Sequence, residues 1–210
     1  MFILDWKSFF IKNVNEFIKL KKIQEEIFLL DKEIPEQVFQ KEFSNYRFEQ
    51  FDNLMSEEFW ATICKLAEWS KDDYVTFAVL SPHPMDYYYK EFGYFNWLEL
   101  PMNLSGDDYL NILNEGPQNY EADSIINNST IITLFSPSKK WGIWADRDYE
   151  INVIAFNDND LNIDAVLDTK VWLSAENEAV QEWMSYTFRP DFKVPYSISN
   201  KLIMNYAKNK

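Results

Sequence analysis

The sequence predicts an α+β fold with N-terminal helices, a central antiparallel meander at about 130–156 within a larger sheet, and C-terminal helices. Three observations lead to this prediction. Much of the first 70 residues carries apolar residues three and four positions apart, the spacing of a buried helix face. Residues 130–156 contain three short β-branched and aromatic runs, joined by connectors too short for parallel strands. Helical spacing returns after residue 174, so helices should follow the sheet.

The N-terminal third is expected to be mainly helical. Residues 5–30 form the longest helical pattern, and Asp5 is placed to cap it. Ser56 is a good cap for a helix over 57–69, whose first turn carries two glutamates that the helix dipole favours. Between these helices the sequence predicts a second helical stripe, formed by Val38, Phe39, Phe43 and Tyr46.

The next segments alternate between strands and one helix. Residues 74–80 have the composition of a buried strand, and a second strand is expected at 95–100, stopped by Pro101. Ser105 is placed to cap a helix over 106–115, with two aspartates in its first turn. The sheet should therefore contain more strands than the meander alone.

The meander is expected to consist of strands at 130–135, 141–145 and 149–156. Because side chains alternate along a strand, each face of the third strand should carry apolar groups, and helices should cover part of both faces. One face should hold Ile151, Val153 and Ala155, and the other Asn152, Ile154 and Phe156.

Two helices are predicted to complete the chain. Ser174 should cap a helix that reaches about 187, and residues 197–208 should form a short last helix. Residues 1–210 are interpreted as a single α+β domain, because no Gly/Ser/Pro linker marks the one conceivable boundary near residue 70.

The acidic charge is regional. The chain carries a net charge of −14, and residues 91–188 contain only four Lys and Arg against seventeen Asp and Glu. This charge opposes binding to nucleic acid or anionic membranes, because phosphate contacts need Lys and Arg. The same region is rich in aromatic residues, and acidic groups beside aromatic anchors suit a basic protein partner.

The residues needed for common catalytic and cofactor sites are scarce. His83 is the only histidine, and with the only cysteine, Cys64, it cannot supply the ligands of a zinc site. His83 is expected in an exposed turn and Cys64 as a buried, inert thiol. The four glycines are too far apart to build a phosphate-binding loop, so no nucleotide or other cofactor is expected. The Asp/Asn run at 158–164 resembles the start of a calcium loop, but Ile163 replaces its glycine, which favours a solvated loop.

The turn at 146–150 is the main candidate for partner binding, because a hairpin would hold its charges in fixed positions. Its acids are expected to be solvated, with Arg147 neutralising its neighbours. Trp141 and Trp144 should point to opposite faces of their strand, so that one packs in the core and the other is free for a partner or a covering helix. The candidate partner-binding residues are Asp146, Asp148, Glu150 and Trp144, with Asp107 and Asp108 as the second choice.

The segment from Ser136 to Glu150, which leads into the strand at 151–156, is similar to strand-turn-strand segments of small bacterial immunity-type proteins of uncharacterised families. Such proteins bind and block a toxin, often a basic nuclease, made by the same cell. The resemblance implies a protein that neutralises a basic toxin by occluding its surface, rather than an enzyme. A cytoplasmic location is expected from the sequence itself, because it shows neither a signal-peptide pattern nor an apolar stretch long enough to span a membrane. Two alternatives stay open: an adaptor or structural protein that is acidic only for solubility, and a carboxylate-dependent hydrolase. The oligomeric state is left open.

Overall fold

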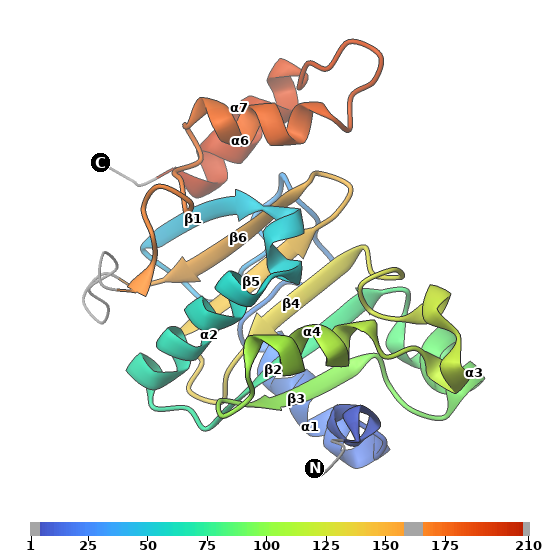
Figure 1. The fold of residues 1–210 in the computed structure, drawn as a ribbon. Helices are drawn as coiled ribbons and strands as arrows, with labels where there is room; N and C mark the ends of the chain where they lie inside the picture. The colour runs from blue at the N-terminus through green and yellow to red at the C-terminus, as the bar shows by residue number, and fades with distance from the viewer. Residues whose placement is uncertain (1–4, 158–165, 208–210) are drawn as a thin grey trace.

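The computed structural model describes residues 5–157 and 166–207, and Figure 1 shows a central sheet with helices on both of its sides. The sheet is six-stranded, its strand order is β1-β6-β5-β4-β2-β3, and every neighbouring pair is antiparallel. The predicted α+β class is therefore confirmed. The strands are β1 (Asn45–Gln50), β2 (Tyr74–Ser81), β3 (Trp97–Pro101), β4 (Ile131–Phe135), β5 (Trp141–Asp146) and β6 (Ile151–Phe156).

The predicted meander is confirmed as strands β4, β5 and β6, which lie side by side in the centre of the sheet. Alternate residues of β6 pack into two different apolar clusters, with Val153 in one and Ile154 in the other, as the period of a strand requires. Trp141 and Trp144 likewise point to opposite faces, but both are buried. Of the two alternatives for the second tryptophan, the covered one is therefore found, because elements pack on both faces of the sheet.

The front face of the sheet, turned towards the viewer in Figure 1, is covered by α2 (Glu57–Ser70) and α4 (Gly106–Asn114). Both helices begin where the sequence predicts. The Ser56 Oγ accepts a hydrogen bond from the Phe59 amide, and Ser105 forms a capping box with Asp108. Behind these caps, Trp60 of α2 stacks on Tyr109 of α4 with ring centroids 4.8 Å apart. The two helices thus share one apolar layer over the sheet.

The back face is covered by α1 (Val14–Glu25), by the extended segment 27–43, and by the C-terminal helices α6 (Glu178–Ser185) and α7 (Tyr196–Tyr206). The extended segment lies close against strand β5 because that strand carries a glycine. A Cβ atom on Gly142 would lie 2.8 Å from Ile27 Cγ2 and 2.9 Å from a ring carbon of Phe28. The absence of a side chain at this position lets Phe28 pack between Phe39, Phe135 and Trp144.

The helix predicted over 5–30 is confirmed only for residues 14–25, and its predicted start at Asp5 is wrong. The segment begins with a short 3-10 helix, η1 (Trp6–Phe9), followed by α1, which Asn13 caps instead of Asp5. Between them Phe10 bridges to Leu98, and the Ile11 amide donates to the Trp97 carbonyl at 2.9 Å. Long-range pairing with the sheet therefore interrupts the helical pattern.

The stripe of apolar residues after Pro35 is extended rather than helical. Phe39 bridges to Phe28, and the Leu29 amide donates to the Val38 carbonyl at 2.8 Å. The chain then enters β1 at Asn45. The apolar residues are buried as predicted, but backbone pairing within the segment 27–43 satisfies their amides without a helix.

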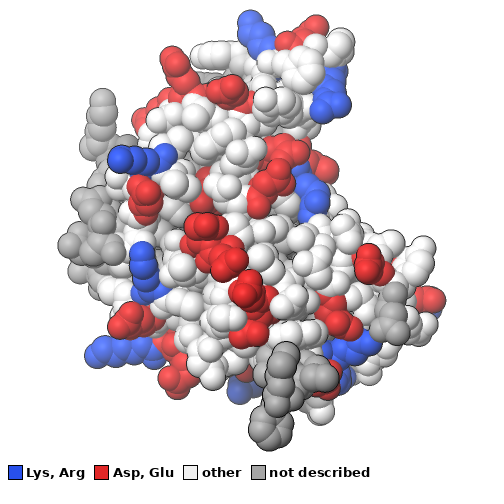
Figure 2. Space-filling view, viewed as in Figure 1, with Lys and Arg blue, Asp and Glu red and all other residues white. Residues whose placement is uncertain are grey.

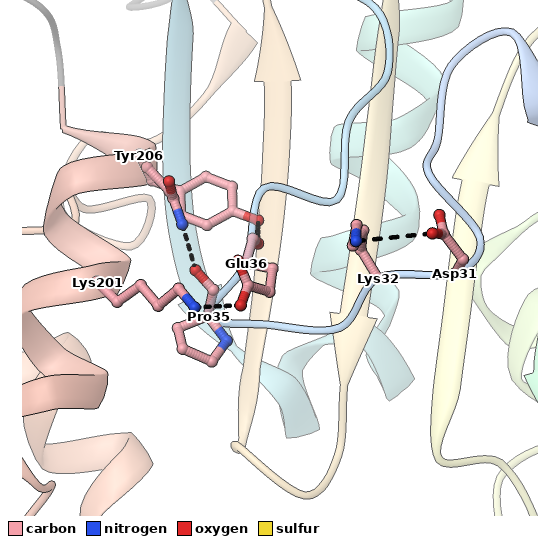
Figure 3. Close-up of polar contacts among 7 residues, drawn as sticks. Asp31, Lys32, Pro35, Glu36, Lys201 and Tyr206 are labelled. Carbon is pink, nitrogen blue, oxygen red and sulfur yellow. Dashed lines mark hydrogen bonds and ion pairs between the residues drawn. The ribbon is translucent and has the colours of Figure 1, made fainter.

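The C-terminal helices are tied to the back face by polar contacts from α7, which Figure 3 shows. The Tyr206 hydroxyl accepts from the Val38 amide at 3.0 Å and donates to the Glu36 carbonyl, and Lys201 forms an ion pair with Glu36. The preceding helix, α6, begins after Asn177 rather than at the predicted Ser174, because Leu173 is held extended by an antiparallel bridge to Phe48 of β1.

Single-residue bridges lie against both outer strands of the sheet. Phe10 pairs with β3 at one edge, and Leu173 pairs with β1 at the other. The remaining short elements are η2 (Phe51–Met55), η3 (Pro84–Tyr89), α3 (Lys90–Phe92), η4 (Pro117–Asn119) and η5 (Glu121–Asp123). Across 5–157 and 166–207, no helix has both the length and the apolar character needed to cross a membrane.

Candidate partner-binding face

The turn between β5 and β6 exposes fewer of its acids than the sequence suggests. Asp146 is only 3% exposed, and its Oδ1 accepts a hydrogen bond from the Tyr149 amide at 3.1 Å. Burial raises the pKa of this carboxyl to about 7. The prediction of a solvated Asp146 is therefore wrong, and Trp144, which is 1% exposed, is equally unavailable to a partner. Asp148, which is exposed, and Glu150, which is half-buried, stay candidates.

The charge of Arg147 interacts with Asp148 and Glu150 of the turn, as the sequence predicts, but its hydrogen bonds go to a different loop. Its Nε donates to the Ser129 carbonyl at 2.6 Å, its Nη2 donates to the Ile126 carbonyl at 2.9 Å, and its guanidinium lies over the Phe51 ring. Because these contacts hold the guanidinium against backbone carbonyls, the turn is anchored to its neighbours. Burial raises the pKa of Glu150, and the negative charge of Asp52 adds to that shift. Two acids from different elements therefore lie near one another beside the turn.

A second group of acids lies where the N-termini of α2 and α4 meet. A Cβ atom on Gly106 would lie 2.7 Å from Glu57 Cβ, so the first turns of the two helices are in contact. Glu57 and Glu58 open α2, and Asp107 and Asp108 open α4. The helix dipole favours acids at these positions, which is a structural reason for their presence. Asp108 is also engaged in the cap, since its Oδ2 accepts from the Ser105 amide at 3.0 Å.

A pocket of about 410 Å³ opens between these two helix ends. Its wall combines carboxylates with apolar surface and the half-buried Cys64, whose pKa burial raises. Cys64 is thus less buried than predicted. The pocket is lined by Glu57, Glu58, Trp60, Ala61, Cys64, Leu104 and Gly106.

Together, the turn and the helix ends place a group of acids on the front of the molecule. Figure 2 shows acidic side chains running down the middle of this face, with most of the visible Lys and Arg towards its margins. We call this surface the acidic face. It comprises Asp52, Glu57, Glu58, Asp107, Asp148 and Glu150.

A buried acid that the sequence analysis missed lies beneath this surface. Glu49 of β1 is 4% exposed, and burial raises its pKa to about 8. Its Oε1 accepts from Asn53 Nδ2 at 3.3 Å, whereas its Oε2 has no hydrogen-bond partner within the described residues. Glu49 lies opposite Asn152 on the front face, while Asp146 points to the back face. The two buried carboxyl groups are therefore separated by the sheet and cannot form one acid–base pair.

The remaining candidate residues lie apart from the acidic face. His83 is exposed, as predicted, and its Nδ1 accepts from the Asp86 amide at 3.0 Å at the start of η3. The calcium-like run at 158–164 lies outside the described residues. Among the residues that the structure does describe, no group of three or more His, Cys, Asp or Glu is arranged to hold a metal ion.

Comparison with known proteins gives no relative for this chain: no family model, no curated protein and no solved structure matches it.

Proposed function

We propose that the chain binds a basic protein through the acidic face and blocks the surface that it covers, in the manner of an immunity or inhibitor protein. The observation that carries the proposal is the grouping of acids from four separate elements on one face: the η2 segment, the ends of α2 and α4, and the β5–β6 turn. The resemblance of residues 136–156 to immunity-type proteins makes a basic toxin domain the first partner to test.

The backbone that carries these acids is held in place without a partner. Serine caps begin both helices, and Arg147 anchors the turn to the loop at 126–129. Preorganised charges cost little entropy on binding and speed the encounter with an oppositely charged surface. We therefore expect the acidic face to act mainly on the association rate.

The pocket between the helix ends is suited to a Lys or Arg side chain of the partner. Glu57 and Glu58 would face the charged group, while Trp60 and Leu104 provide apolar surface for the aliphatic stem. Each helix N-terminus carries about half a positive charge, which opposes a cation, but the adjacent carboxylates carry a full negative charge each. The net field at the pocket therefore favours a cation.

The test is a charge-neutralised triple variant, Glu58→Gln, Asp107→Asn and Asp148→Asn. The matched control removes three exposed acids from the α1 and 27–43 side: Glu25→Gln, Asp31→Asn and Glu42→Gln. The partner to use first is any basic domain encoded by the gene immediately upstream, with cytochrome c as a non-cognate basic protein. Association rates measured at low and at physiological salt should fall about tenfold for the triple variant and little for the control.

Each outcome has a distinct meaning. Equal slowing by both variants would show that only net charge matters, as in a protein that is acidic for solubility. Binding and protection at the wild-type level by the triple variant would place the contact elsewhere on the chain. If the upstream domain binds no more tightly than cytochrome c, the inhibitor proposal fails and the adaptor or structural alternative is favoured.

A further inference from the structure

A second pocket, of about 510 Å³, lies on the back of the molecule between α1 and the ends of β2 and β3. Its volume falls in the range of small-molecule sites. Aromatic and aliphatic side chains form most of its wall, and Phe17 lies against Trp97 with ring centroids 4.7 Å apart. The lining residues are Phe17, Ile18, Lys21, Gln24, Leu30, Leu80, His83, Pro84, Met85 and Trp97.

The buried part of this pocket contains a polar side chain, Gln24, whose carbonyl oxygen has no hydrogen-bond partner within the described residues. Gln24 is 0% exposed, and its Nε2 donates to Thr133 Oγ1 at 2.7 Å. The Thr133 hydroxyl donates in turn to the Ala78 carbonyl at 3.5 Å, which sets the orientation of the Gln24 amide. A buried acceptor without a donor, such as Gln24 Oε1, is costly, and a ligand donor would satisfy it.

The exposed side of the pocket offers hydrogen-bond donors. His83 Nδ1 accepts from the Met85 and Asp86 amides, which places the ring proton on Nε2. Lys21, which is exposed on α1, brings an ammonium group. A carboxylate lies near each group: Asp86 is 3.3 Å from His83 Nδ1, and Glu25 forms an ion pair with Lys21 Nζ at 3.7 Å. One ammonium group and one ring N–H donor at the rim suit a single carboxylate better than a multiply charged anion.

We propose that this pocket binds a small aromatic monocarboxylate whose ring carries an O–H or N–H group. The ring lies between the apolar walls, its donor reaches Gln24 Oε1, and its carboxylate meets Lys21 and His83 at the rim. This site is on the opposite side of the sheet from the acidic face, and it does not depend on the proposed binding of a basic protein.

Four matched probes test each part of the proposal. They are 3-(4-hydroxyphenyl)propionate, 3-(4-methoxyphenyl)propionate, 3-phenylpropionate and 3-(4-hydroxyphenyl)propionamide. Titrations followed by NMR should shift the indole N–H signal of Trp97, assigned with Trp97→Phe, and the methyl signal of Met85. The hydroxyphenyl acid should bind roughly tenfold more tightly than the phenyl acid, because only it supplies a donor to Gln24. The methoxy acid should bind no more tightly than the phenyl acid, because it has no O–H to donate. The amide should bind more weakly than the hydroxyphenyl acid, because it lacks the carboxylate that contacts Lys21 and His83.

Two variants separate binding from folding. Lys21→Met removes the exposed cation and should weaken the acids but not the amide, whereas Lys22→Met, one residue away and outside the pocket lining, should leave all four affinities unchanged. Gln24→Leu should bind the phenyl acid like the wild type and abolish the preference for the hydroxyl group. The proposal is overturned if none of the probes shifts Trp97 or Met85 at millimolar concentration, if the hydroxyl preference survives in Gln24→Leu, or if Lys21→Met behaves like Lys22→Met.

Discussion

The front and back faces of the sheet bury similar apolar cores, but the elements that cover them are held in different ways. On the front, α2 and α4 begin at serine caps formed within each helix's own first turn. On the back, the covering segments depend on partners far away in the sequence, such as Gln24 with Thr133 and Tyr206 with Val38. Local caps thus start the helices of the acidic face, while Arg147 holds its turn through a longer-range contact with the loop at 126–129. On the back, Asn13 caps α1 locally, but the pocket near His83 is built by contacts between segments far apart in the sequence.

The largest expected effect concerns whether the two faces fold together. Trp60→Ala on the front and Phe28→Ala on the back each remove a fully buried ring and should each lower the free energy of unfolding by about 3–5 kcal/mol. Because both faces share the same strands, urea unfolding followed by circular dichroism should show one transition in each variant. Tyr120→Ala, at a 63% exposed position, is the control and should change little. Two separate transitions in Phe28→Ala would mean that the back face unfolds independently.

The second prediction compares the buried acids of the two faces across pH. Glu49 holds its proton more tightly in the folded chain than in the unfolded chain, since its pKa rises from 4.5 to about 8. The folded state therefore binds more protons within that window, and stability should fall as pH rises through it. Asp146 should act with the same sign from about pH 4 up to about 7.

Glu49→Gln should remove most of this pH dependence. The amide keeps an acceptor for Asn53 and adds a donor for Asn152 Oδ1, which has no partner within the described residues. At pH 8.5 the variant should be roughly 2–4 kcal/mol more stable than the wild type, and the two should converge near pH 4. Asp146→Asn should give a smaller gain in stability, and this gain should reach its full size about one pH unit lower than the gain of Glu49→Gln. Denaturant unfolding at a series of pH values measures both, and parallel wild-type and Glu49→Gln curves would refute the buried-acid account.

The third prediction tests a long-range contact of the back face. Tyr206→Phe removes the acceptor of the Val38 amide and the donor to the Glu36 carbonyl, and should cost about 1–3 kcal/mol. Hydrogen exchange at the Val38 amide should accelerate more than exchange in α2. Unchanged exchange at Val38 would show that this tyrosine does not hold the segment in place.

The smallest effect is expected from a local contact of the front face. Ser105→Ala removes the cap of α4 and should cost about 1 kcal/mol, with faster exchange at the Asp108 amide. Ser8→Ala, at an exposed position in η1, serves as a comparison with a smaller expected cost. If Ser105→Ala lost much more stability than Tyr206→Phe, the ranking of local and long-range contacts would be contradicted.

The features that the sequence predicted correctly depend on signals a few residues apart. Ser56 and Ser105 were identified as caps because the cap and the first turn are neighbours, and the meander followed from connector length. The extended segment 27–43 could not be predicted in this way. Its apolar residues have a helix-like spacing, but backbone pairing within the segment and the close approach to the sheet at Gly142 both favour the extended form.

The candidate site was predicted in part. Asp148, Glu150 and Asp107 are at the surface as expected, whereas Asp146 and Trp144 are buried. The burial of Asp146 could have been predicted from the alternation of side chains along a strand. Residues two apart share a face, so Asp146 lies on the same covered face as the buried Trp144. No comparable pattern marks Glu49 or Gln24, because their burial comes from elements distant in the sequence.

The bridges formed by Phe10 and Leu173 have a consequence for the two edges of the sheet. Unpaired outer strands are templates for sheet growth between molecules, and these two residues come from opposite halves of the chain to shield β3 and β1. At each edge the bridge is formed by a single residue of a segment that lies outside the six strands. Partial detachment of either segment would therefore open a route to edge-to-edge aggregation while the six strands themselves are still intact.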